Sequence, residues 1–206
     1  MCWLCDHPGA TERDYQDHMR ELIDTFGWAV QGVERDGIHP PWAYTVGLTP
    51  RRRPELVITG MDLSQATQVL NGVAAHLVRE EPPAPGTQAA LRDGPLVEVI
   101  RVAAPWAHLN LAVEFYGQRI RGLQLVHADE RGRWPWDDAY QGVPGGQPVL
   151  GPREPPEHRR RVLRALKGRL GPSRGDPSPG RGRRSAGRGP RRRCGPGPPR
   201  RPWWRR

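Results

Sequence analysis

The chain has 206 residues, of which 36% are hydrophobic and 26% are charged, a length that suits one or two domains. Its net charge of +10 is unevenly divided, because residues 1–153 carry 14 Arg against 19 Asp or Glu, whereas residues 154–206 carry a net charge of +15. No apolar run approaches the ~20 residues of a membrane span, the first residues resemble no secretory signal, and three cysteines are too few for a disulfide framework. We therefore expect a cytoplasmic protein without membrane contact.

Several catalytic classes are excluded by residue types that the sequence lacks. Lys167 is the single lysine, so neither a P-loop nor a Schiff-base lysine is present before residue 154. Ser64 is the single serine before residue 154, and it lies in no Gly-x-Ser-x-Gly elbow. There is also no His-Glu-x-x-His zinc-protease motif. These absences leave open whether the chain is an enzyme, and we favour a protein that is not one.

The first half of the chain predicts one helix followed by three strands. Apolar residues at steps of three and four predict a helix over residues 11–26, begun by Thr11 with Asp14 and ended by Gly27. Strand-forming residues predict strands over 28–35, 42–48 and 55–59. Gly32 interrupts the first of these strands and predicts a β-bulge.

The next part predicts helices alternating with strands. A helix begun by Asp62 or Ser64 is expected to run to about Val78, and a short helix is expected over 106–116. Strands are expected over 96–102 and 119–127. Because successive strands in the first half are joined by short loops, the expected class is α+β, a single domain over 1–153 with a mainly antiparallel sheet and about three helices.

Residues 154–206 differ in kind from the rest of the chain. They hold 10 Pro and 9 Gly, a composition that buries too little apolar surface to offset backbone ordering. We therefore expect a disordered basic tail, with a short amphipathic helix over 156–170.

A set of short motifs, in order along residues 1–153, resembles a known family. The motifs are residues 1–8 (MCWLCDHP), 27–30 (GWAV), 42–49 (WAYTVGLT), 54–57 (PELV), 116–117 (YG), 123–126 (LQLV), 132–137 (GRWPWD) and 147–151 (QPVLG). Together they resemble the bacterial domain-of-unknown-function 4262 family. One departure is that many members carry a His before the PELV strand, where this chain has Arg51, Arg52 and Arg53. A role that rests on that His is not carried over.

The resemblance implies no enzymatic activity, since none is established for the family. The element order is also loosely similar to suppressor-of-fused-like domains, whose bacterial relatives include immunity proteins of toxin systems. That likeness concerns the fold alone.

The N-terminal Cys2-x-x-Cys5 is the sharpest chemical motif. Its spacing suits two tetrahedral zinc ligands, and His7 lies next to it as a third candidate ligand. Two alternatives remain open: a pair of buried thiols packing beneath Trp3, and a redox pair. The sequence therefore names zinc as the one candidate cofactor.

Aromatic residues beside Pro and Gly form the second candidate site. Trp42, Tyr44, Trp134 and Trp136, with Asp137, are of the types that line binding surfaces. The alternative is that these rings fill the core or fasten loops to the sheet.

Arginine clusters in the tail form the third candidate site. Arg183, Arg184, Arg191, Arg192 and Arg193 lie among Gly and Pro and would bind nucleic-acid phosphates without sequence preference. The alternative is an unselected extension, because GC-rich codons supply Arg, Pro, Gly and Ala.

Three functions follow from these sites. The favoured one is a non-enzymatic domain that binds a protein or small ligand, with an immunity-type role as one version. The others are a zinc- or thiol-dependent enzyme or sensor using Cys2 and Cys5, and a nucleic-acid-binding accessory protein acting through the tail.

Overall fold

The computed structural model of the chain describes residues 3, 7–91, 94–142 and 146–153. The chain divides into two units, Met1–Pro156 and Glu157–Arg206, and all described residues belong to the first. The expected tail over 154–206, its expected helix over 156–170 and its arginine clusters lie outside the described residues. In the described part of the chain, no helix is long and apolar enough to cross a membrane.

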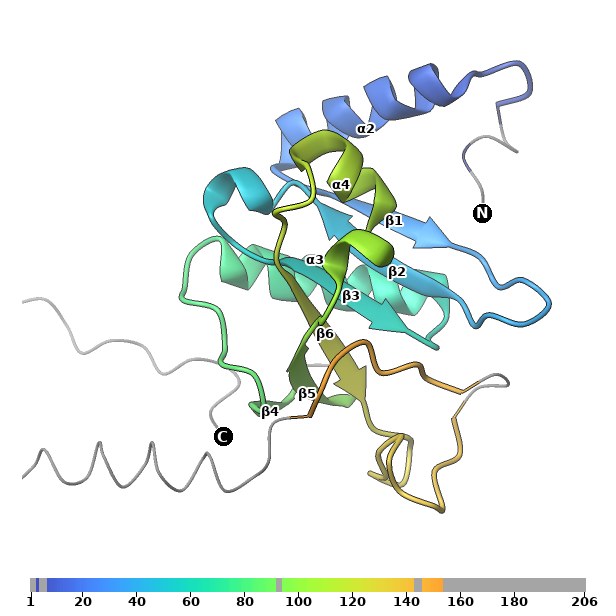
Figure 1. The fold of residues 1–206 in the computed structure, drawn as a ribbon, viewed down its shortest axis with the longest axis vertical. Helices are drawn as coiled ribbons and strands as arrows, with labels where there is room; N and C mark the ends of the chain where they lie inside the picture. The colour runs from blue at the N-terminus through green and yellow to red at the C-terminus, as the bar shows by residue number, and fades with distance from the viewer. Residues whose placement is uncertain (1–2, 4–6, 92–93, 143–145, 154–206) are drawn as a thin grey trace, which may run out of the picture. The chain divides into compact units, whose positions relative to one another are not determined.

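A six-stranded sheet in the order β1-β2-β3-β6-β5-β4 forms the centre of the fold (Figure 1). Its strands are β1 (Ala29–Val33), β2 (Trp42–Val46), β3 (Glu55–Thr59), β4 (Gln88–Ala90), β5 (Leu96–Arg101) and β6 (Gly122–His127). Neighbouring strands are antiparallel except β3 and β6, which run parallel. With the helices described below, this sheet confirms the predicted α+β class.

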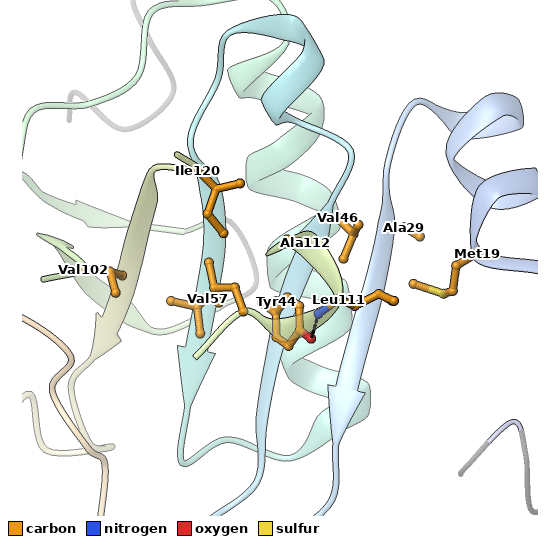
Figure 2. Packing of buried hydrophobic residues seen from close by; sticks show 10 residues of the cluster. Met19, Ala29, Tyr44, Val46, Val57, Val102, Leu111, Ala112 and Ile120 are labelled. Atoms are coloured by element: carbon orange, nitrogen blue, oxygen red, sulfur yellow. Dashed lines mark hydrogen bonds between the residues drawn. The ribbon is translucent and has the colours of Figure 1, made fainter. Parts of the chain in front are cut away.

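Helices cover both faces of the sheet (Figure 1). They are the α-helices α2 (Glu12–Phe26), α3 (Leu63–Leu77) and α4 (Asn110–Tyr116), with the 3-10 helices η1 (Thr49–Arg51) and η2 (Pro105–Ala107). Helix α3 packs against β1, β2 and β3 on one face. On the other face, Met19 of α2 and Leu111 of α4 join the sheet residue Tyr44 in a buried apolar cluster (Figure 2).

Local sequence signals explain the ends of α2. Thr11 and Asp14 form a capping box, in which the Asp14 amide donates to Thr11 Oγ1 (3.2 Å) and the Thr11 amide donates to Asp14 Oδ2 (2.8 Å). Gly27 ends the helix in the left-handed region at φ +92°, a conformation that favours glycine. Both ends are as the sequence predicted.

Three details differ from the sequence expectation. The bulge predicted at Gly32 is wrong, because Gly32 pairs regularly with Ala43; the missing side chain instead makes room for Leu63 of α3, 3.4 Å from where a Cβ would lie. Strand β4 was not predicted, because its Gln-Ala-Ala sequence holds no strong strand former. The helix expected over 106–116 is divided into η2 and α4.

The QPVLG motif lies in a segment that is fastened to the sheet. We call residues 146–153 the C-terminal strap. The fully buried Gln124 donates from Nε2 to the Pro148 carbonyl (2.7 Å) and accepts at Oε1 from the Leu150 amide (2.7 Å). Leu150 also packs against the apolar cluster. A single side chain in β6 therefore satisfies two backbone groups of the strap, as buried polar groups require.

Candidate functional site

A cleft of about 1030 Å³ opens where β3 and β6 end. It is lined by residues 60–62 after β3, by Gln65 in the first turn of α3, and by residues 94–96, 127–133 and 140–142. The parallel pairing of β3 and β6 brings their carboxyl ends to one edge of the sheet, the edge at which open sheets commonly bind ligands.

Asp129 organises the loop that forms one wall of the cleft. Its Oδ1 accepts the backbone amides of Arg131 (2.9 Å) and Arg133 (2.9 Å), and its Oδ2 accepts the amide of Gln141 (3.1 Å) and Nε of Arg133 (2.8 Å). Burial acts to raise the pKa of Asp129, but the hydrogen bonds from Arg133, Gln141 and Arg131 outweigh it and lower the pKa to about 2. The carboxylate is therefore ionised at neutral pH and joins two distant parts of the loop.

Arg133 is only partly used by this contact. Its Nε is held by Asp129, and its side chain is 22% exposed. The terminal nitrogens of its guanidinium make no hydrogen bond to any residue that the structure describes. A largely buried cation in the cleft wall therefore keeps donors that an entering ligand can use.

A buried amide connects Tyr140 to the end of β6. Gln147 accepts the His127 amide at Oε1 (2.9 Å), and its Nε2 donates to the His127 carbonyl (3.0 Å) and to Tyr140 Oη (2.8 Å). Burial raises the pKa of Tyr140; the hydrogen bond from Gln147 opposes this, and the negative charge of Asp129 adds to it. The phenol is therefore protonated at neutral pH, and its O–H remains a donor.

His127 lines the cleft as a neutral ring. Burial lowers the pKa of its imidazole, and the nearby carbonyls of Ala128, Thr59 and Gly60 oppose that shift without reversing it. Its Nε2 is buried and forms no hydrogen bond with good geometry to a described residue. The ring therefore adds a polar but uncharged surface beside Tyr140.

The N-terminus of α3 also faces the cleft, but its donors are occupied. Asp62 caps the helix, and its Oδ1 accepts the amides of Ser64 (2.9 Å) and Gln65 (3.2 Å). The chain's own carboxylate thus takes the place that an anion would otherwise take at a helix N-terminus. The free donors of the cleft are therefore side chains rather than helix amides.

The structure places two of the predicted aromatic residues in or beside the core. Tyr44 is buried, its Oη accepts the Leu111 amide (3.2 Å), and burial raises its pKa to about 12. Trp42 is half-buried against the same apolar cluster. Neither lines the cleft.

The other three predicted residues form a separate group. Trp134 and Trp136 stack with their ring centroids 5.3 Å apart, and Asp137 accepts the Trp134 amide (2.8 Å). The guanidinium of Arg153 lies 4.1 Å from the Trp136 ring and pairs with Glu98 (2.9 Å). These contacts fasten the loop and the end of the strap to β5, and none of the three residues lines the cleft.

The predicted metal ligands are divided between described and undescribed residues. Cys2 and Cys5 lie outside the described residues, as do the tail arginines. The His7 ring stacks on the Trp3 indole, with ring centroids 4.1 Å apart, and the His18 ring stacks on the same indole with centroids 5.1 Å apart. Among the residues that the structure does describe, no three His, Cys, Asp or Glu side chains are placed to hold a metal ion.

Sequence reasoning missed Arg133, Tyr140 and Gln147 as candidate site residues. Two of them lie inside motifs that the resemblance identified, GRWPWD and QPVLG. Arg133 directly precedes Trp134, and its place inside the GRWPWD motif is the one sequence signal that pointed to it.

Comparison with known proteins identifies one family. A family model described as "Domain of unknown function (DUF4262)" matches residues 22–141. No curated protein and no solved structure matches the chain significantly. The looser likeness to suppressor-of-fused-like domains therefore stays a prediction.

Proposed function

The chain belongs to the DUF4262 family, and from that premise we propose that its folded domain binds a small polar ligand in the cleft at the ends of β3 and β6. The proposal rests on polar side chains that line this cleft. Hydrogen bonds to neighbouring residues hold these side chains in place, and each of them keeps at least one donor free for a ligand. Arg133 is held by Asp129 and Tyr140 by Gln147. Such prearranged groups bind ligands at a lower entropic cost than mobile ones.

The lining residues favour binding over catalysis. No Ser, Thr, Cys or Lys is among the described residues that line the cleft, so no nucleophile of these types is present there. Asp129 is a poor general base, because its hydrogen bonds lower its pKa to about 2. A concave site of this volume is better suited to binding a small molecule than to binding the flat surface of a protein partner. An immunity-type role with a protein partner stays a prediction from the resemblance.

A screen of small molecules by thermal unfolding of the full chain tests the proposal. Gln141→Trp places a large ring at the exposed rim of the cleft, and Gln118→Trp makes the same change at an exposed position that does not line it. A ligand at 100 times its Kd stabilises the protein by about 2.7 kcal/mol. We expect such a ligand to stabilise the unmodified chain and Gln118→Trp, and to have little effect on Gln141→Trp. A ligand that stabilises both variants equally would place binding elsewhere.

A second candidate function is zinc binding by Cys2, Cys5 and His7. The observation that favours it is the orientation of the His7 ring, whose Nδ1 lies 2.8 Å from the Trp3 carbonyl oxygen. A carbonyl can only accept, so Nδ1 donates in this contact, and Nε2 is the ring nitrogen left to bind a metal. Metal-binding histidines are commonly oriented by such a contact. A zinc- or thiol-dependent sensor or enzyme would follow from this site.

A further inference from the structure

We infer that the ligand of the cleft carries a carboxylate group, bound jointly by the guanidinium of Arg133 and the hydroxyl of Tyr140. This inference rests on the proposed function and names the chemistry of the ligand. Neither Arg133 nor Tyr140 is among the site residues that the sequence predicts.

The two donors are arranged around one carboxylate of the protein. Asp129 Oδ2 accepts both Nε of Arg133 (2.8 Å) and the amide of Gln141, the residue after Tyr140 (3.1 Å). The charge of Asp129 also acts on the phenol of Tyr140. Residues 133 and 140 are therefore held at the same wall of the cleft, with their side chains close to a common anchor.

Arg133 presents the geometry that a carboxylate needs. With Nε engaged by Asp129, the remaining N–H groups lie on the two terminal nitrogens of a planar guanidinium, which binds carboxylates in a forked arrangement. The side chain is largely buried, at 22% exposed, so its hydrogen bonds to a ligand are less weakened by solvent than those of a surface arginine.

Tyr140 supplies one more donor. Its oxygen already accepts from Gln147 Nε2 (2.8 Å), so the hydroxyl hydrogen is the group left for a ligand. Because the pKa of Tyr140 is raised by burial, that hydrogen is present throughout the neutral range. A carboxylate has two acceptor oxygens for the Tyr140 hydroxyl and the Arg133 guanidinium, and both residues line the cleft.

The charges of the cleft favour a monoanion over a dianion. Arg131 and Arg133 face three acids that also line the cleft, namely Asp62, Asp129 and Glu130. Asp129 is balanced by Arg133 and three backbone amides, and Asp62 by the amides of α3. The formal charge of these five side chains is −1, which opposes a phosphate dianion more strongly than a single carboxylate.

The test is a titration of the full chain with acetate, followed by the amide NMR signals of Arg131, Arg133 and Gln141, with chloride keeping the ionic strength constant. Following individual amides separates binding in the cleft from binding to the arginines of the tail. We expect saturable shifts with a Kd in the millimolar range, since a ligand of about four heavy atoms can bind only weakly. Inorganic phosphate, titrated in the same way, should bind these amides less tightly.

Two variants with matched controls make the test specific. Tyr140→Phe removes only the hydroxyl and should weaken acetate binding about fivefold, whereas Tyr116→Phe, outside the cleft, should leave it unchanged. Arg133→Lys keeps the charge but loses the fork and should weaken binding at least about tenfold, with Arg119→Lys as its control. The amide spectrum without ligand shows whether each variant keeps the fold of the loop.

The outcomes separate this inference from the proposed function. Equal acetate affinity in Tyr140→Phe and Arg133→Lys, no saturable shift, or tighter binding of phosphate would overturn the carboxylate assignment. If neutral molecules shift the cleft amides while acetate does not, the cleft still binds ligands and the carboxylate assignment alone fails. If the ligands found by screening bind Gln141→Trp as well as the unmodified chain, the proposed function itself fails.

Discussion

Gly151 packs directly against the main chain of Arg101, so that a Cβ atom at position 151 would overlap the Arg101 carbonyl oxygen. The strap reaches this close approach because Ala103 donates its amide to the Leu150 carbonyl (2.9 Å). The glycine that ends the QPVLG motif is therefore required by backbone contact between the strap and the segment that follows β5.

The first prediction concerns that contact. Gly151→Ala should lower the free energy of unfolding by about 3 kcal/mol, because the backbone of the strap or of β5 must move to admit the methyl group. The control is Gly37→Ala, where no atom lies within 4 Å of the new Cβ. Gly132→Ala is less suitable, because Gly132 has a φ of +75°, which an alanine adopts only with strain. Urea unfolding of the two variants measures the difference. Equal stability would show that the strap is free to shift.

The second prediction concerns where the folded domain ends. A chain ending at Arg153 should unfold cooperatively with nearly the midpoint of the full chain. A chain ending at Gly151 loses the pair between Arg153 and Glu98, whose carboxylate is only 3% exposed. We expect it to be less stable by about 2 kcal/mol, between the values for surface and buried pairs. Thermal unfolding compares the three chains. A large loss of stability already at Arg153 would mean that the fold needs residues of the tail.

The third prediction concerns the buried carboxyl of Glu55. Burial raises its pKa above the ordinary value of 4.5, although hydrogen bonds from Thr45 and Thr49 oppose the shift. A carboxyl with a raised pKa in the folded state contributes stability that is complete below its unfolded pKa and is lost as pH rises through its folded pKa. Glu55→Gln does not titrate, so its stability relative to the unmodified protein should rise with pH above 4.5. Urea unfolding across pH 4 to ~8 measures this slope.

The control for this prediction is Glu55→Ala, which removes the acceptor altogether. The backbone amide of Thr49 (2.8 Å) would then be left without its partner, at a cost of about 1–3 kcal/mol for each unsatisfied group. A difference between Glu55→Gln and the unmodified chain that is the same at every pH would show that the carboxyl does not titrate in this range.

The fourth prediction concerns metal. If zinc is bound by Cys2, Cys5 and His7, the purified protein should carry close to one equivalent, and the double change Cys2→Ser and Cys5→Ser should abolish it. Uptake should release protons, because thiolates are the ligands. His7→Ala should also weaken zinc binding. His39→Ala is its control and should leave zinc binding unchanged, since His39 pairs with Asp36 in a different loop. Protein that holds no zinc after purification without chelator, with unchanged stability in the double variant, would leave the thiols as packing residues.

The fifth prediction concerns the tail. With its net charge of +15, the full chain should bind duplex DNA without sequence preference. If about six arginines contact phosphates, the affinity should fall by roughly three decades between 50 and 200 mM salt. The chain ending at Arg153 carries a net charge of −5 and should not bind. Binding that survives this truncation, or that does not respond to salt, would show that the arginine clusters are not the contact.

The sequence by itself determined the elements whose causes are local. The capping box of Thr11 and Asp14 and the stop at Gly27 involve residues within a few positions of each other, so α2 could be predicted almost to the residue. Strand-forming runs located β2, β3, β5 and β6 in the same way, and short connections gave the α+β class. The bulge at Gly32 was wrong because the reason for that glycine lies in α3, at Leu63.

Only the tertiary structure decided where a ligand could bind. The cleft exists because β3 and β6 pair in parallel although 67 positions separate paired residues such as Val57 and Gln124. The contact between Gln147 and His127 likewise joins the strap to a strand 20 positions earlier. Local periodicity and composition do not encode such pairings, because these depend on which packing of all elements buries the most apolar surface while satisfying every buried polar group.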